Sequence, residues 1–142
     1  MKELPGNVFV SGQLMPAQIQ VLAEQGVKSV INNRPDQEAP LQPLSEEMEA
    51  AAEAASLGYL HIPMSAGLTP DLIAASIKAF ESAPRPIVVF CASGRRSTVL
   101  WAFAHIDQLG IDAVMQAMSD AGYQLEQIRN PLMEFAARDR TC

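Results

Sequence analysis

Short apolar runs alternate along this chain with longer segments of helical spacing, and this alternation limits the fold more than any other feature. The clearest run, Ile87-Val88-Val89-Phe90, lies between prolines and a cysteine. A continuous apolar run of this length is typical of a central strand buried on both faces. Similar runs predict strands near residues 8–10, 27–32 and 59–62. Strands that alternate with helices indicate an α/β fold, with a central, mostly parallel sheet of four to five strands flanked by helices.

The helices between these strands are marked by their ends. Thr69, Pro70 and Asp71 form a clear helix start, with a capping hydroxyl, a proline in the first turn and an acid facing the helix dipole. Three prolines predict a loop over residues 33–43. The expected helices cover residues 16–25, 45–57, 70–82, 97–109 and 112–137, the last with breaks near Gly122 and Pro131.

Length and charge limit the possible functions. The 142 residues fit one domain, predicted to span residues 1–142, and a chain of this length needs neither disulfides nor metal to fold. The net charge of −6 argues against non-specific binding to nucleic acid or to an anionic membrane. An anionic substrate must therefore be attracted by a local positive site.

The cysteine content predicts a reduced, cytoplasmic protein. Two cysteines, Cys91 and Cys142, are too few for a disulfide framework or a zinc site, and no cofactor is expected. No signal-peptide core or run of transmembrane length is visible. A role for Cys142 as a resolving thiol stays open as a minor alternative.

Residues 91–98, Cys-Ala-Ser-Gly-Arg-Arg-Ser-Thr, carry the strongest chemical signal. They lie between a buried strand and a helix start, so the backbone N–H groups of Ala92, Ser93, Gly94, Arg95, Arg96 and Ser97 are expected to form an anion-binding loop. These amides, the helix dipole and an arginine should lower the pKa of Cys91 and make it a thiolate nucleophile. The hydroxyl of Ser97 or Thr98 could donate to that thiolate.

A purely structural Cys91 is the competing interpretation, because buried cysteines are common. The neighbouring arginines argue against it. Arg95 and Arg96 stand at a helix start, where positive charge opposes the dipole unless an anion binds there. One of them could hold two anion oxygens in a bidentate fork, and the sequence does not decide which.

A second polar segment follows the second predicted strand and should reach the same sheet edge. Arg34 and Asp36 lie in it, as a supporting cation and a candidate proton donor. Asn32 and Asn33 are expected chiefly to hydrogen-bond the turn backbone. His61 and His105 are expected to be structural histidines.

With these motifs in place, the chain resembles the phosphatase-like domain of the beta-lactamase-hydrolase-like proteins, which shares the fold of dual-specificity and tyrosine phosphatases. The resemblance rests on four segments, residues 10–14, 26–36, 59–63 and 90–98. It implies a central sheet flanked by helices, a phosphate- or sulfate-binding loop and covalent chemistry on Cys91.

The chain departs from the tyrosine phosphatase pattern at three points. Four residues, not five, separate Cys91 from Arg96, so Ser97 occupies the phosphatase arginine position, and four is the rhodanese spacing. Phe90 replaces the histidine that usually precedes the cysteine. Residues 63–67 contain no acid where dual-specificity phosphatases have an aspartate, which leaves Asp36 as the best proton donor.

These departures leave three functions open. A shorter loop and a missing acid slightly favour a sulfurtransferase that forms a persulfide on Cys91 and passes its sulfur to a thiol acceptor. The alternative is a phosphatase that forms a cysteinyl-phosphate from a phosphomonoester or phosphotyrosine, with Arg96 binding the anion and Asp36 protonating the leaving group. The third is a non-catalytic anion-binding module that serves a metallo-beta-lactamase-like hydrolase.

Overall fold

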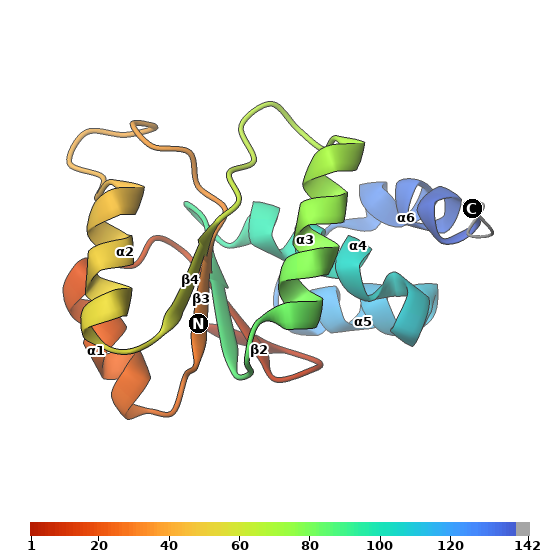
Figure 1. The fold of residues 1–142 in the computed structure, drawn as a ribbon. Coiled ribbons are helices and arrows are strands. Elements are labelled where there is room, and N and C mark those ends of the chain that lie inside the picture. The colour runs from red at the N-terminus through yellow and green to blue at the C-terminus, as the bar shows by residue number, and fades with distance from the viewer. Residues whose placement is uncertain (139–142) are drawn as a thin grey trace.

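A computed structural model describes residues 1–138, and helices cover both faces of its sheet (Figure 1). The strands are β1 (Lys2–Leu4), β2 (Val8–Ser11), β3 (Ser29–Asn32), β4 (Gly58–His61) and β5 (Ile87–Phe90). The helices are α1 (Pro16–Glu24), α2 (Ser45–Ala54), α3 (Pro70–Ser82), α4 (Arg95–Leu109), α5 (Ile111–Asp120), the 3₁₀ turn η1 (Glu126–Ile128) and α6 (Arg129–Ala136). The predicted α/β class is confirmed.

The sheet has the order β1-β2-β5-β3-β4, and only β1 runs antiparallel to its neighbour. Sequence analysis missed β1, because its three residues include two exposed charged side chains and only Leu4 is buried. β5 is central, as its apolar run predicted, and all four of its side chains are buried.

Alternate residues of β5 enter two separate cores, as the two-residue period of a strand requires. Val88 and Phe90 pack with the core beneath α1 and α2. Ile87 and Val89 pack with the larger core beneath α3 to α6, which contains the fully buried Trp101. The two helical layers lie on opposite sides of the sheet in Figure 1.

The predicted helix ends are mostly confirmed. Thr69 Oγ1 accepts a hydrogen bond from the N–H of Leu72 at 3.1 Å, so it caps α3 as expected. Three boundaries were wrong: α2 ends at Ala54 rather than near residue 57, α4 begins at Arg95 rather than Ser97, and Pro131 lies in the first turn of α6 rather than at a break. Cys142 lies outside the described residues. In the part of the chain that the structure describes, no helix is long and apolar enough to span a bilayer.

The strand register brings three loops to one edge of the sheet. Ser11 of β2 and Asn32 of β3 both pair with Phe90 of β5, so these strands end level with one another. The residues that follow, from Gly12, Asn33 and Cys91, therefore leave the sheet side by side. This is the edge at which open parallel sheets place their sites.

The fold makes a direct prediction about Trp101. Its side chain has no exposed surface, and its Nε1–H donates to the carbonyl of Pro5 at 3.3 Å. Trp101→Ala is expected to lower the free energy of unfolding by about 3–5 kcal/mol, because it opens a large cavity. Urea denaturation measures this change. Met133→Ala, at an exposed position on α6, should shift stability by about 0.5 kcal/mol or less, and equal losses in both variants would contradict the assigned core.

Candidate active site

Cys91 lies at the floor of a loop whose amides turn toward its sulfur. The residue is fully buried, and the N–H of Gly94 donates to Sγ at 3.1 Å. Burial of the sulfur opposes ionisation, but hydrogen bonds from Ser97, Ser93 and Gly94 outweigh it and lower the pKa of the Cys91 thiol below its ordinary value. The loop therefore favours ionisation of this thiol, and the role of Cys91 as a nucleophile stays a prediction.

The neighbouring carbonyls are held on the outer side of this loop. The N–H of Gln13 donates to the carbonyl of Ala92 at 3.2 Å. In a planar trans peptide the C=O and N–H point in opposite directions, so this contact turns the N–H of Ser93 inward. Gly12 permits the close approach, since a Cβ there would lie 3.0 Å from the Ala92 carbonyl oxygen.

Gly94 forms the turn from the loop into α4. Its φ of +91° lies in the left-handed region, which side chains disfavour. A Cβ at this position would also lie 2.1 Å from the Tyr123 hydroxyl oxygen. Glycine is thus required here for both its backbone angle and its lack of a side chain.

Arg96, and not Arg95, is the arginine that turns into the site. Arg95 is exposed. Arg96 donates from Nη1 and Nη2 to the two carboxylate oxygens of Glu38, at 2.8 and 2.9 Å, and from Nη1 to the carbonyl of Met64 at 2.9 Å. Contact with Glu38, and to a smaller extent with the Cys91 thiolate, raises the pKa of Arg96.

Glu38 lies between two guanidinium groups, a role the sequence did not reveal. Arg34 Nε also donates to its Oε1, at 2.9 Å. Hydrogen bonds from Arg96, opposed by partial burial, and from Arg34 lower the pKa of Glu38 from 4.5 to about 2. Glu38 is therefore ionised at neutral pH and positions Arg96 rather than donating a proton. The sequence signal that could have revealed this role of Glu38 is its position two residues after Asp36, in the loop that also contains Arg34.

Asn33 takes part in the site, whereas the sequence predicted that it would chiefly hydrogen-bond the backbone of the turn. Its Nδ2 donates to the carbonyl of Ile62 at 2.9 Å, which directs its Oδ1 toward Ser97. The Ser97 hydroxyl donates to that Oδ1 at 2.8 Å. This hydroxyl also lies within reach of the Cys91 sulfur, and its one proton can serve only one acceptor at a time.

The remaining predicted residues have defined partners. Thr98 was expected as a possible donor to the thiolate, but its hydroxyl donates to the carbonyl of Gly94 at 2.7 Å, one helical turn back. Arg34 reaches the site, where its Nη1 donates to Gln13 Oε1 at 3.0 Å. Asp36 Oδ1 accepts from the N–H of Ser45 at 2.8 Å, at the start of α2. Its role as proton donor stays a prediction.

The two histidines make structural contacts away from the sulfur. His61 Nε2 hydrogen-bonds the carbonyl of Arg34 at 2.8 Å. His105 Nδ1 bonds the carbonyl of Trp101 at 2.8 Å, and burial lowers the pKa of His105. Within residues 1–138, no group of three or more His, Cys, Asp and Glu side chains is arranged to hold a metal ion.

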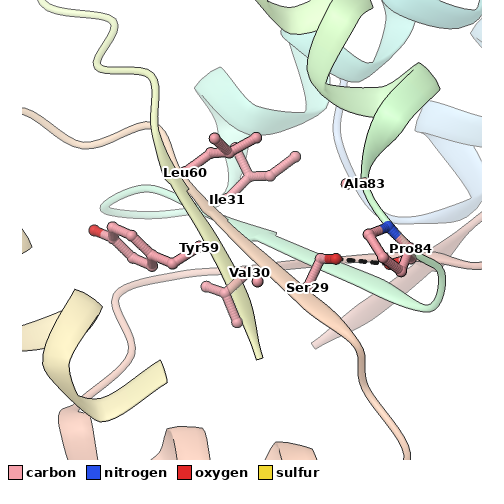
Figure 2. Close-up of a pocket in the computed structure, with 8 residues that line it drawn as sticks. Ser29, Val30, Ile31, Tyr59, Leu60, Ala83 and Pro84 are labelled. Carbon is pink, nitrogen blue, oxygen red and sulfur yellow. Dashed lines mark hydrogen bonds between the residues drawn. The ribbon is translucent and has the colours of Figure 1, made fainter. Parts of the chain in front are cut away.

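A separate apolar cavity of about 200 Å³ lies along the edge strand β4. Figure 2 shows Tyr59 and Leu60 on opposite sides of this strand, and the hydrogen bond of 2.7 Å from Ser29 Oγ to the Pro84 carbonyl. None of its lining residues belongs to the Cys91 loop or carries a formal charge at neutral pH. This cavity therefore offers no charged group to an anion.

Comparison with known proteins places this chain in a family. A family model described as the phosphatase-like domain of beta-lactamase hydrolase-like protein matches residues 1–108. The beta-lactamase hydrolase-like protein of Agrobacterium fabrum is 38% identical over 99 residues, 67% of this chain and 22% of that protein. The protein of the same name from Xylella fastidiosa (strain Temecula1) is 34% identical over 101 residues, 70% and 23% of the two lengths. The chain thus spans less than a quarter of these relatives.

Solved structures share the whole fold. A Neisseria meningitidis protein (nma1982) superposes with a TM-score of 0.81 at 27% identity, covering 94% of this chain and 96% of that one. The core catalytic domain of the PP-IP phosphatase SIW14 from S. cerevisiae superposes with a TM-score of 0.66 at 12% identity, covering 96% and 83%. The second likeness concerns the fold alone. The predicted dual-specificity-phosphatase-like architecture is confirmed.

The Glu38 ion pairs predict how stability depends on pH. Because the pKa of Glu38 is about 2 in the folded protein and 4.5 ordinarily, its contribution is present above about pH 4.5 and is lost as the pH falls toward 2. Glu38→Gln should lower the free energy of unfolding at neutral pH by about 1 kcal/mol or less. It should also flatten the decline in stability between pH 4.5 and 2, measured by urea denaturation at several pH values. Glu53→Gln on the exposed face of α2 is the matched control, and an unchanged acid profile in Glu38→Gln would refute the assignment.

Proposed function

This chain belongs to the phosphatase-like domain family of the beta-lactamase hydrolase-like proteins, and we propose that it is a cysteine-dependent phosphatase acting on phosphomonoesters. The observation that carries the proposal is the convergence on one sulfur of the amides of Ser93, Gly94 and Ser97, beside the guanidinium of Arg96. Such an arrangement stabilises a thiolate and offers donors to the oxygens of a bound anion.

The orientation of Arg96 leaves donors for a phosphate. Glu38 and Met64 accept hydrogen bonds from Nη1 and Nη2. The Nε–H and the second Nη2–H lie on the adjacent edge of the guanidinium plane, which can bind two phosphate oxygens as a bidentate fork. Glu38 thereby holds one edge of the group and presents the other.

The proposed reaction has two steps. The Cys91 thiolate attacks phosphorus, an S–P bond forms, and the P–O bond to the leaving group breaks with its electron pair on oxygen. That oxygen takes a proton from a general acid or from water. Water then attacks the cysteinyl-phosphate, which releases inorganic phosphate, regenerates the thiolate and transfers the water proton to a base.

The leaving group determines how much acid catalysis is needed. Glu38 cannot supply a proton at neutral pH, because Arg96 and Arg34 keep its pKa at about 2. Asp36 remains the candidate, in the loop that also holds Arg34. A phenol needs less help than an alcohol, since phenoxide is the weaker base. We therefore propose aryl phosphates, including phosphotyrosine, as the better substrate class.

Phosphate transfer has more support than sulfur transfer. The matching family model carries a phosphatase-like description and covers residues 1–108. The four-residue spacing between Cys91 and Arg96 remains the specific observation in favour of a sulfurtransferase. The relatives extend far beyond this chain, so service to a metallo-beta-lactamase-like hydrolase is a further proposal, in which the loop binds the anion without turnover.

Turnover of p-nitrophenyl phosphate tests the proposal. Cys91→Ser should abolish it, because a serine hydroxyl in this loop is not ionised at neutral pH. Arg96→Lys should reduce kcat/KM by about 10²-fold or more, because lysine cannot form the bidentate fork. Arg95→Lys, at the exposed neighbour, is the matched control and should retain nearly full activity.

Mass spectrometry distinguishes the outcomes. A phosphoryl adduct on Cys91 after brief exposure to the aryl phosphate supports the phosphatase. A single added sulfur after exposure to thiosulfate, with thiocyanate formed from cyanide and no aryl phosphate turnover, replaces it by the sulfurtransferase. If the protein binds sulfate but forms neither the phosphoryl nor the sulfur adduct on Cys91, the result supports the non-catalytic anion-binding module.

Asp36 is tested by the choice of leaving group. If Asp36 is the acid, Asp36→Asn should reduce kcat for an alkyl phosphate by about 10²-fold or more, and kcat for p-nitrophenyl phosphate much less. Steady-state kinetics with both substrates measure the difference. The amide introduced by this substitution keeps an acceptor oxygen for the Ser45 N–H, so a uniform loss for both substrates would point to loop structure rather than proton donation.

A further inference from the structure

The Tyr123 hydroxyl contacts the outer side of the Cys91 loop. Tyr123 follows α5, beyond residues 1–108 to which the family model is matched. Its Oη donates to the carbonyl of Ser93 at 3.1 Å. Its ring is half-buried against the core beneath α3 to α6, so ring and hydroxyl make separate contacts.

One peptide group connects this hydroxyl to the sulfur. The Ser93 carbonyl that accepts from Tyr123 belongs to the same peptide as the Gly94 N–H, which donates to Cys91 Sγ at 3.1 Å. Because C=O and N–H point in opposite directions in a trans peptide, holding the carbonyl outward holds the N–H inward. Hydrogen bonds in such a chain also polarise one another, which strengthens the donor at the sulfur.

We infer that Tyr123 is a positioning residue for the Cys91 thiolate, acting through the Ser93–Gly94 peptide. The inference rests on the proposed function only in taking Cys91 as the nucleophile. It assigns a role in the chemistry to the segment after α4, for which the sequence predicted only helices with a break near Gly122.

Two features suit Tyr123 to this role. Burial, and then the charge of Cys91, raise the pKa of Tyr123, so the phenol keeps its proton and stays a donor. The loop also accommodates the hydroxyl closely, since any Cβ at Gly94 would collide with it. The adjacent peptide is held in the same manner by the Gln13 N–H on the Ala92 carbonyl. Two consecutive amides are thus directed at the sulfur by donors outside the loop.

Titration of the thiol tests this role directly. In a Cys142→Ser background Cys91 is the only thiol, and the ultraviolet absorbance of the thiolate against pH gives its pKa without any substrate. Tyr123→Phe keeps the ring and removes the hydroxyl. It should raise the pKa of Cys91 by roughly half a unit to one unit, the size expected for weakening one hydrogen bond. Tyr59→Phe, at the other tyrosine, should leave that pKa unchanged.

The pH profile of turnover gives a second reading. In Tyr123→Phe the acidic limb of kcat/KM should move to higher pH by the same amount, with most of the lost activity regained above the new pKa. An unchanged Cys91 pKa in a folded Tyr123→Phe protein overturns the inference, as does an equal shift in Tyr59→Phe. If the Cys142→Ser protein with Tyr123 intact shows a lowered Cys91 pKa but hydrolyses no aryl phosphate, the proposed function is contradicted. The effect of Tyr123→Phe on the Cys91 pKa can still be measured in that case.

Discussion

The hydrogen bonds that converge on the Cys91 sulfur are the interaction on which the site depends. Burial of a thiol ordinarily raises its pKa, and here hydrogen bonds from Ser93, Gly94 and Ser97 outweigh that effect and lower the pKa of Cys91. An amide can donate inward only if its peptide is turned, and contacts outside the loop turn these peptides. The N–H of Gln13 holds one carbonyl and Tyr123 holds the next. Gly12 and Gly94 lie where these outer contacts come closest to the loop, and a side chain at either position would crowd them.

Two arginines gather in the site of an acidic protein, and Glu38 forms an ion pair with each of them. The net charge of −6 gives no general attraction for anions. Arg96 lies beside the Cys91 thiol, and Glu38 binds Arg96 through its Nη1 and Nη2 groups and Arg34 through its Nε group. A carboxylate in this position fixes the guanidinium orientation at the cost of part of its charge. Orientation matters more here, because a bidentate fork requires a fixed plane.

Much of this arrangement could be predicted from the sequence. The strand runs and helix starts gave the α/β class, and the loop of residues 91–96 followed from a cysteine between a buried strand and a helix. The hydrophobic pattern did not predict β1, because a three-residue edge strand with two charged side chains has no apolar alternation. Arg34 was placed correctly in a loop beside Cys91, since parallel strands end at a common edge.

The sequence alone identified the loop that begins at Cys91 as the candidate site, because strand burial, glycine placement and a thiol beside arginines are local properties. Only the tertiary structure decided which arginine faces the sulfur, since Arg95 and Arg96 are neighbours whose directions differ by one step of a helix. It also decided the roles of Glu38, Asn33 and Tyr123, which lie far from Cys91 along the chain. Their hydrogen bonds depend on strand register and helix packing, and such long-range geometry leaves no periodic trace in the sequence.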